Sequence, residues 1–213
     1  MENNWHTYDT EVLIWEIHLP SHPSDREYQR WERTVLDAGE AHDVYRVQRT
    51  GEPERLLFSA SVGLRGTSRL AYVETTDQIR EHDVVYVTEL PGLKTQFGQH
   101  LKSQPPLQFM SDLGDDGVYV WVCSHTTIWL PWQPNNGLYD DLPDEALIDN
   151  RALAERHTPR LNAFLADIGD AARAAGGRMR LDRTDTSRDY LPFVDDNGVR
   201  LDIPDGAAGR LVG

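Results

Sequence analysis

The chain has little cysteine: Cys123 is the only one among 213 residues. One thiol cannot form an intramolecular disulfide, and it cannot supply the several sulfur ligands of a structural zinc or iron–sulfur site. A chain of this length buries enough apolar surface to fold without such crosslinks. We therefore expect a single domain over residues 1–213, with a core from about residue 9 to residue 203 and an extended tail at 204–213.

Long apolar runs are also missing. The longest, about residues 118–123, is far shorter than the roughly 20 residues that cross a bilayer. The first six residues, Met-Glu-Asn-Asn-Trp-His, have neither the basic nor the apolar segment of a secretory signal. These absences predict a protein of the cytoplasm or of a non-secreted assembly, without a signal peptide or a transmembrane segment.

Basic residues are scarce relative to acidic ones. Lysine and arginine total 21 against 35 aspartates and glutamates, which gives a net charge of −14. Residues 81–150 alone carry 11 acidic residues and two lysines, Lys94 and Lys102. A surface this negative repels phosphate backbones and anionic lipid, so we expect neither nucleic acid nor membrane as a partner. It can instead steer the chain toward a basic protein.

The common catalytic and cofactor motifs are absent as well. The chain has no Gly-x-Gly-x-x-Gly, no phosphate-binding Gly-x-x-x-x-Gly-Lys-Ser/Thr and no Gly-x-Ser-x-Gly. It also lacks His-Glu-x-x-His and the ligand run of a calcium loop. These absences favour a protein that is not an enzyme, and we expect no cofactor.

Apolar periodicity predicts an α+β fold with a mainly antiparallel sheet. Strands are predicted at residues 11–18, 44–49, 55–62, 69–74, 83–89, 107–110 and 118–124. One helix is predicted from Ser24 to about Ala38, stopping at Gly39. A second is predicted with Thr158 as its cap and Pro159 in its first turn, and it ends at residues 176–177. Residues 126–144 are predicted to form an irregular loop, and the chain is predicted to be helical after it. Residues 195–198 predict a terminal β-hairpin.

The predicted strand at residues 118–125 has two different faces. Valines alternate with Tyr119, Trp121, Cys123 and His125. An imidazole near a thiol can lower its pKa and create a nucleophile, although residues two apart on a strand are about 6–7 Å apart. The alternative is that both faces are buried, or that the aromatic face meets a helix or a partner. Cys123 and His125 thus support only the alternative function, a small metal- or Cys/His-dependent hydrolase.

Histidines offer one candidate metal site. His18 and His22 are close in the sequence, and Asp25 could complete a zinc site with them. Two prolines nearby instead favour surface histidines in a turn between strand and helix. We expect no metal.

Residues 129–145 are rich in aromatic and acidic side chains. Trp129, Trp132 and Tyr139 lie near Asp140 and Asp141. Tryptophan and tyrosine are enriched at binding hot spots, and acids beside them would steer a basic partner. The competing interpretation is a loop folded over the sheet, with its tryptophans covering the core.

The hypothesis that follows is a non-enzymatic protein-interaction or assembly protein. It would dock through the aromatic–acidic segment 129–145, supported by Tyr119 and Trp121 on the neighbouring strand. Two versions remain open: a structural subunit of a larger complex such as a virion, and an acidic inhibitor of a basic partner. The partner would be another protein or further copies of the same chain.

Overall fold

The structure is a computed structural model that describes residues 12–20, 24–48, 58–60, 69–75, 107–135, 143 and 146–202. Its centre is a four-stranded sheet in the order β5-β6-β1-β9, and every neighbouring pair is antiparallel. The strands are β1 (Leu13–Pro20), β5 (Leu107–Gly114), β6 (Gly117–Ser124) and β9 (Arg178–Leu181). With the helices described below, this sheet confirms the predicted α+β class.

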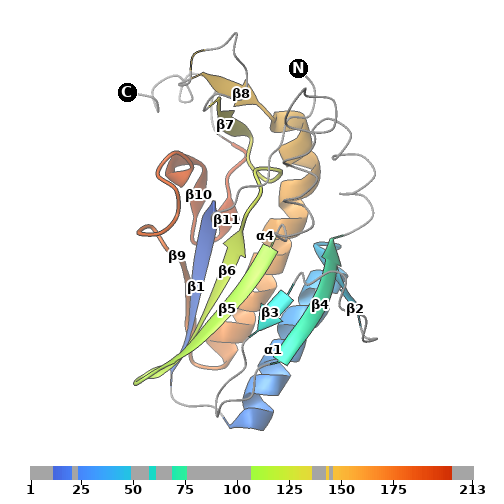
Figure 1. Ribbon diagram of the computed structural model, residues 1–213, viewed down its shortest axis with the longest axis vertical. Coiled ribbons are helices and arrows are strands. Elements are labelled where there is room, and N and C mark those ends of the chain that lie inside the picture. The colour runs from blue at the N-terminus through green and yellow to red at the C-terminus, as the bar shows by residue number, and fades with distance from the viewer. Residues whose placement is uncertain are drawn as a thin grey trace.

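Both long helices lie on one side of the sheet. In Figure 1 the strands β5 and β6 cross in front of α4 (Arg151–Ala174), and α1 (Asp25–Ala41) lies beside α4. The ring of Phe109 on β5 meets that of Phe164 on α4 edge-on, with centroids 6.1 Å apart. The core between these layers contains large apolar side chains with almost no exposed surface, including Trp15, Ile17, Phe109, Val122, Phe164 and Leu165.

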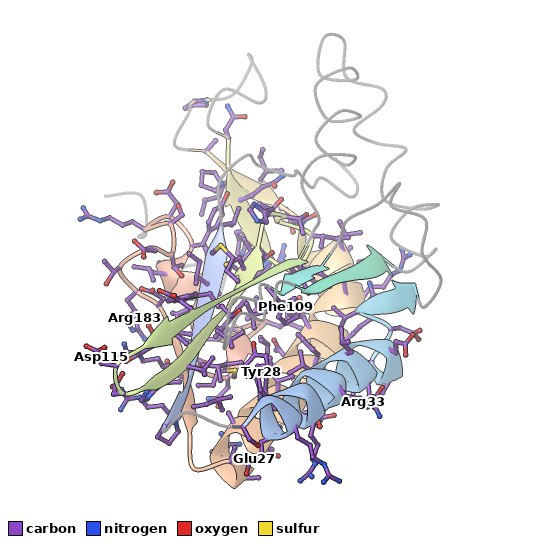
Figure 2. All side chains as sticks on the ribbon, turned by 60° about the horizontal axis from the view of Figure 1, so that its bottom comes forward. Glu27, Tyr28, Arg33, Phe109, Asp115 and Arg183 are labelled. Carbon is purple, nitrogen blue, oxygen red and sulfur yellow. The ribbon has the colours of Figure 1, made fainter. Side chains whose placement is uncertain are left out.

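Helix α1 begins where the sequence predicts. Ser24 is its N-cap, and the Glu27 carboxylate accepts hydrogen bonds from the Ser24 backbone N–H (2.8 Å) and hydroxyl (2.6 Å). Tyr28, Trp31 and Val35 are buried at spacings of three and four residues. Figure 2 shows Tyr28 on the sheet side of α1.

Helix α1 runs to Ala41, three residues beyond the predicted last residue, Ala38. Gly39 lies inside the helix, and the left-handed residue that ends it is Asp43, at φ 53°. The backbone N–H of Asp43 donates to the Glu40 carbonyl and that of Val44 to the Gly39 carbonyl, the pattern of a Schellman motif. Aspartate tolerates this conformation better than most residues, so the helix does not need its glycine to stop.

Replacing Ser24 with alanine is expected to lower the free energy of unfolding by about 1 kcal/mol, because the Glu27 N–H loses its side-chain acceptor. Ser24→Asp restores an acceptor and is the matched control. Urea denaturation followed by circular dichroism measures both variants. Equal midpoints for Ser24→Ala and the unmodified chain would show that the capping box does not contribute.

The same cap should matter less in acid. Hydrogen bonds from the side chain and backbone of Ser24 lower the pKa of Glu27. A carboxyl whose pKa is lowered by folding stabilises the fold above its ordinary pKa, and this contribution is lost as the pH falls through the lowered value. The difference between Ser24→Ala and the unmodified chain is therefore expected to shrink at acidic pH.

Helix α4 is one continuous helix of 24 residues and starts eight residues before the predicted position. Thr158 does not cap it: this residue is buried within the helix, and its hydroxyl donates to the Trp129 carbonyl. Pro159 removes one backbone hydrogen bond, but Leu153 and Leu161 on either side are fully packed and hold the turns in place. The predicted end is correct, with Gly176 at φ +78°.

Three smaller strand groups complete the described fold. A sheet of β2 (Tyr45–Gln48), β4 (Arg69–Thr75) and β3 (Phe58–Ala60) has the order β2-β4-β3, whereas a simple meander would place β3 in the middle. Strands β7 (Trp132–Pro134) and β8 (Leu147–Asp149) pair within the segments predicted as loop and helix. The predicted hairpin at 195–198 is present as β10 (Val194–Asp195) and β11 (Gly198–Val199). The strand predicted at 83–89 and the tail at 204–213 lie outside the described residues.

Helix α4 holds this C-terminal hairpin through one amide. The Asn162 side chain donates to the Val199 carbonyl at 2.8 Å and accepts the Val199 N–H at 2.9 Å. Gly198 has φ +125°, and a Cβ there would lie 2.2 Å from the Asn162 oxygen. Glycine at this position therefore allows the amide to pair with the strand.

Among the described residues, no helix is both long enough and apolar enough to cross a membrane.

Candidate functional site

The face of the four-stranded sheet that points away from α1 and α4 is the candidate site, and we call it the outer face. Side chains alternate along each strand, so the residues paired across the sheet share a face. We define the outer face by two rows of four side chains, because the next pair on the same side of the sheet, Ile14 and Cys123, is buried. The first row is Asp112, Tyr119, His18 and Arg178; the second is Met110, Trp121, Glu16 and Arg180.

Three rings form a continuous stack at the centre of the outer face. The rings of His18 and Tyr119 are 4.6 Å apart and inclined by 22°, and those of Tyr119 and Trp121 are 6.2 Å apart and inclined by 18°. The Tyr119 and Trp121 side chains are half-buried, whereas only 12% of the His18 side chain is exposed. The stack thus spans β1 and β6, whose opposite side faces the core, and its partly exposed rings are those of Tyr119 and Trp121.

An ion pair borders this stack on the β9 side. The Glu16 carboxylate lies 2.9 Å from Nη2 and 3.1 Å from Nε of Arg180. Only 11% of the Glu16 side chain is exposed, whereas 55% of the Arg180 side chain is. The partner explains how a carboxylate can be nearly buried on this face.

The turn between β5 and β6 holds Tyr119, the middle ring of the stack. The Tyr119 hydroxyl donates to the Asp116 carboxylate at 2.9 Å, and this hydrogen bond raises the pKa of the phenol. Burial and the negative charges of Asp116 and Glu16 act in the same direction, and Arg178 opposes them. Tyr119 therefore stays protonated and remains a donor at neutral pH. Nε2 of His18 lies 3.6 Å from the same carboxylate.

The structure brings together two of the sequence-predicted site residues, Tyr119 and Trp121, and separates them from Trp129 and Trp132. Trp129 has no exposed surface and belongs to the core. Its ring contacts His157 edge-on at 6.4 Å and lies 5.7 Å beneath the Arg160 guanidinium. The competing interpretation, a tryptophan that covers the core, describes Trp129.

Trp132 lies in a small cluster away from the outer face. Its ring is half-buried and lies 4.7 Å from the guanidinium of Arg151. Arg151 also forms an ion pair of 2.7 Å with Asp149, and its hydrogen bonds lower the pKa of that carboxyl. This stack fastens the β7–β8 hairpin to the start of α4. Tyr139, Asp140 and Asp141 lie outside the described residues.

The alternative catalytic pair is enclosed. Cys123 has no exposed surface, and His125 is only 2% exposed. A thiol in this position cannot meet a substrate without an opening of the fold. Among the residues that the structure describes, no group of three or more His, Cys, Asp or Glu side chains is placed to hold a metal. His22 of the candidate zinc site lies outside them.

Sequence reasoning missed six of the eight outer-face side chains as docking residues. Glu16 and His18 alternate with the buried Trp15 and Ile17 on β1, so the period of two along this strand was a usable signal. The remaining four lie on β5 and β9: Met110, Asp112, Arg178 and Arg180. Only the strand register shows that these share a face with Tyr119 and Trp121.

Comparison with known proteins found no matching family model, no matching curated protein and no matching solved structure.

Proposed function

We propose that this protein is a non-enzymatic protein-interaction protein that docks through the outer face of its sheet. The observation that carries the proposal is the continuous stack of His18, Tyr119 and Trp121, in which the tyrosine and the tryptophan are half-buried. Tryptophan, tyrosine and arginine are the residues most enriched at binding hot spots, and all three occur here together. The outer face thus takes the place of segment 129–145 as the docking surface.

The charges on the outer face favour assembly over inhibition of a basic partner. Asp112 and Arg178 are both exposed, at opposite ends of the first row. An inhibitor that covers a basic protein would present a surface of one sign. A surface with both signs suits a partner that itself carries both, as the subunits of an assembly do.

Replacing Trp121 with alanine is expected to weaken partner binding by about 2 kcal/mol, or roughly 30-fold, because a central aromatic anchor is lost. The fold should persist, since Trp121 is half-buried and lies outside the main core. Tagged protein is incubated with lysate of the native host, and captured proteins are quantified by mass spectrometry over a series of bait concentrations. Circular dichroism checks the fold.

Trp132→Ala is the matched control, because it removes a second half-buried tryptophan outside the outer face. We expect this variant to retain the partners of the unmodified chain. If Trp132→Ala loses them and Trp121→Ala keeps them, docking occurs through the β7–β8 region and the outer-face proposal is wrong. If neither change affects capture or self-association, the proposal is also wrong.

A further inference from the structure

The first row of the outer face carries opposite charges at its two ends. Asp112 on β5 and Arg178 on β9 are exposed, and Tyr119 and His18 lie between them. The row thus runs from acid through two rings to base. This order can be matched by a copy of itself, because reversing the row brings each charge opposite its complement.

A two-fold axis parallel to the strands produces this reversal. When two such sheets stack face to face about this axis, β5 of one copy lies over β9 of the other, and β6 lies over β1. Asp112 then faces Arg178 of the second copy, and Tyr119 faces its His18. Both ends of the row form the same pair, as an isologous interface requires.

The other in-plane axis gives the opposite result. A two-fold axis perpendicular to the strands places β5 over β5 and β9 over β9. Asp112 then lies near Asp112 of the second copy, and Arg178 lies near Arg178 of the second copy. Like charges placed together at an interface are unfavourable. The charge order therefore selects one of the two face-to-face arrangements.

We infer that the partner on the outer face is a second copy of this chain, stacked about a two-fold axis parallel to the strands. The inference rests on the proposed function and names its partner. From strand spacing and length, the two faces would bury on the order of 1,000 Å² in total, near the lower limit for a specific interface. We therefore expect a dimer that dissociates on dilution.

Charge reversal tests the arrangement on the purified full-length chain. Asp112→Arg places the introduced arginine opposite Arg178 of the second copy, twice in each dimer. Arg178→Asp creates the corresponding acidic repulsion. Each variant alone is expected to raise the dimer dissociation constant about tenfold or more. Sedimentation velocity from about 1 to about 300 µM covers the range expected for a small interface.

The decisive sample is an equimolar mixture of the two variants. One variant then carries two bases at the ends of its row and the other two acids, so both contacts are complementary in the mixed dimer. We expect the mixture to dimerise at least as well as the unmodified chain. The double variant should also recover dimerisation, because its row is simply inverted.

Arg33→Asp and Asp37→Arg are the controls, because they make the same charge changes on the exposed side of α1. Figure 2 shows Arg33 pointing away from the sheet. These two variants should dimerise normally. A chain that stays monomeric over the whole range overturns the inference, and so does a dimer that the reversals leave unchanged.

Failure of the inference and failure of the proposed function are distinguishable. A monomeric chain that still captures host proteins in a manner dependent on Trp121 keeps the proposed function and gives the outer face a different partner. A monomeric chain whose captured proteins are unaffected by Trp121→Ala rejects both.

Discussion

Trp129→Ala is expected to lower the free energy of unfolding by about 3–5 kcal/mol, the cost of truncating a large side chain that has no exposed surface. The ring packs against His157 and beneath Arg160, both on α4. Its removal would leave a cavity where the 124–131 segment meets that helix. Guanidinium denaturation followed by circular dichroism measures the loss.

Trp129→Phe is the control for this experiment. It keeps most of the buried volume and removes the indole N–H, which has no hydrogen-bond acceptor among the described residues. We expect it to cost less than about 2 kcal/mol. If Trp129→Ala instead leaves the unfolding midpoint unchanged and weakens partner binding, Trp129 lies at a binding surface and segment 129–145 regains its predicted role.

The buried position of Trp129 shows why the docking segment could not be placed from the sequence. Hot spots and protein cores select the same aromatic residues, so composition does not distinguish them. Trp129 and Trp132 are three residues apart, yet one is fully buried and the other half-exposed beside Arg151. Both contact α4, but Trp129 packs against His157 and Arg160 within the helix, whereas Trp132 stacks on Arg151, the first residue of the helix. The difference therefore depends on contacts with residues at least 19 positions further along the chain.

The strands and helices themselves were largely predictable, because their periodicity is local. Val118, Val120 and Val122 alternate with other residues, and β6 follows this alternation. The start of α4 was misplaced because Thr158-Pro159 is a common first turn, and only packing shows that the helix continues through it. Strand β9, Arg-Met-Arg-Leu, was missed because four residues with two arginines give too weak a signal.

The outer face was predictable only in part, because it is made by register. Tyr119 and Trp121 were recognised on one strand, but the Arg180 that pairs with Glu16 lies 164 residues away. No local pattern indicates which strand lies beside β1. The opposite charges at the ends of the first row, on which the dimer inference depends, come from two edge strands and become visible only in the assembled sheet.

Asn150→Asp is expected to lower the free energy of unfolding by about 3 kcal/mol or more at neutral pH. As an N-cap, aspartate is as favourable as asparagine, so the sequence alone predicts little effect. In the structure, however, the Asn150 amide nitrogen donates to the carbonyls of Thr127 (3.2 Å) and Leu130 (3.0 Å), and the residue is only 2% exposed. The substitution would direct a buried carboxylate at two carbonyl oxygens.

Asn150→Ala and a change of pH separate charge from lost hydrogen bonds. Alanine removes both hydrogen bonds without adding a charge and should lower the free energy of unfolding by about 1–3 kcal/mol.

Burial raises the pKa of the introduced carboxyl, whose protonated form can donate to one carbonyl. The stabilisation by this protonated form is fully present below the pKa of the carboxyl in the unfolded chain. It is lost as the pH rises through the raised pKa of the carboxyl in the folded chain. The aspartate variant should therefore be less stable than the alanine variant at pH 7 and approach it in acid; urea denaturation at both pH values measures this. A gap that does not change with pH would mean that Asn150 does not bind these carbonyls.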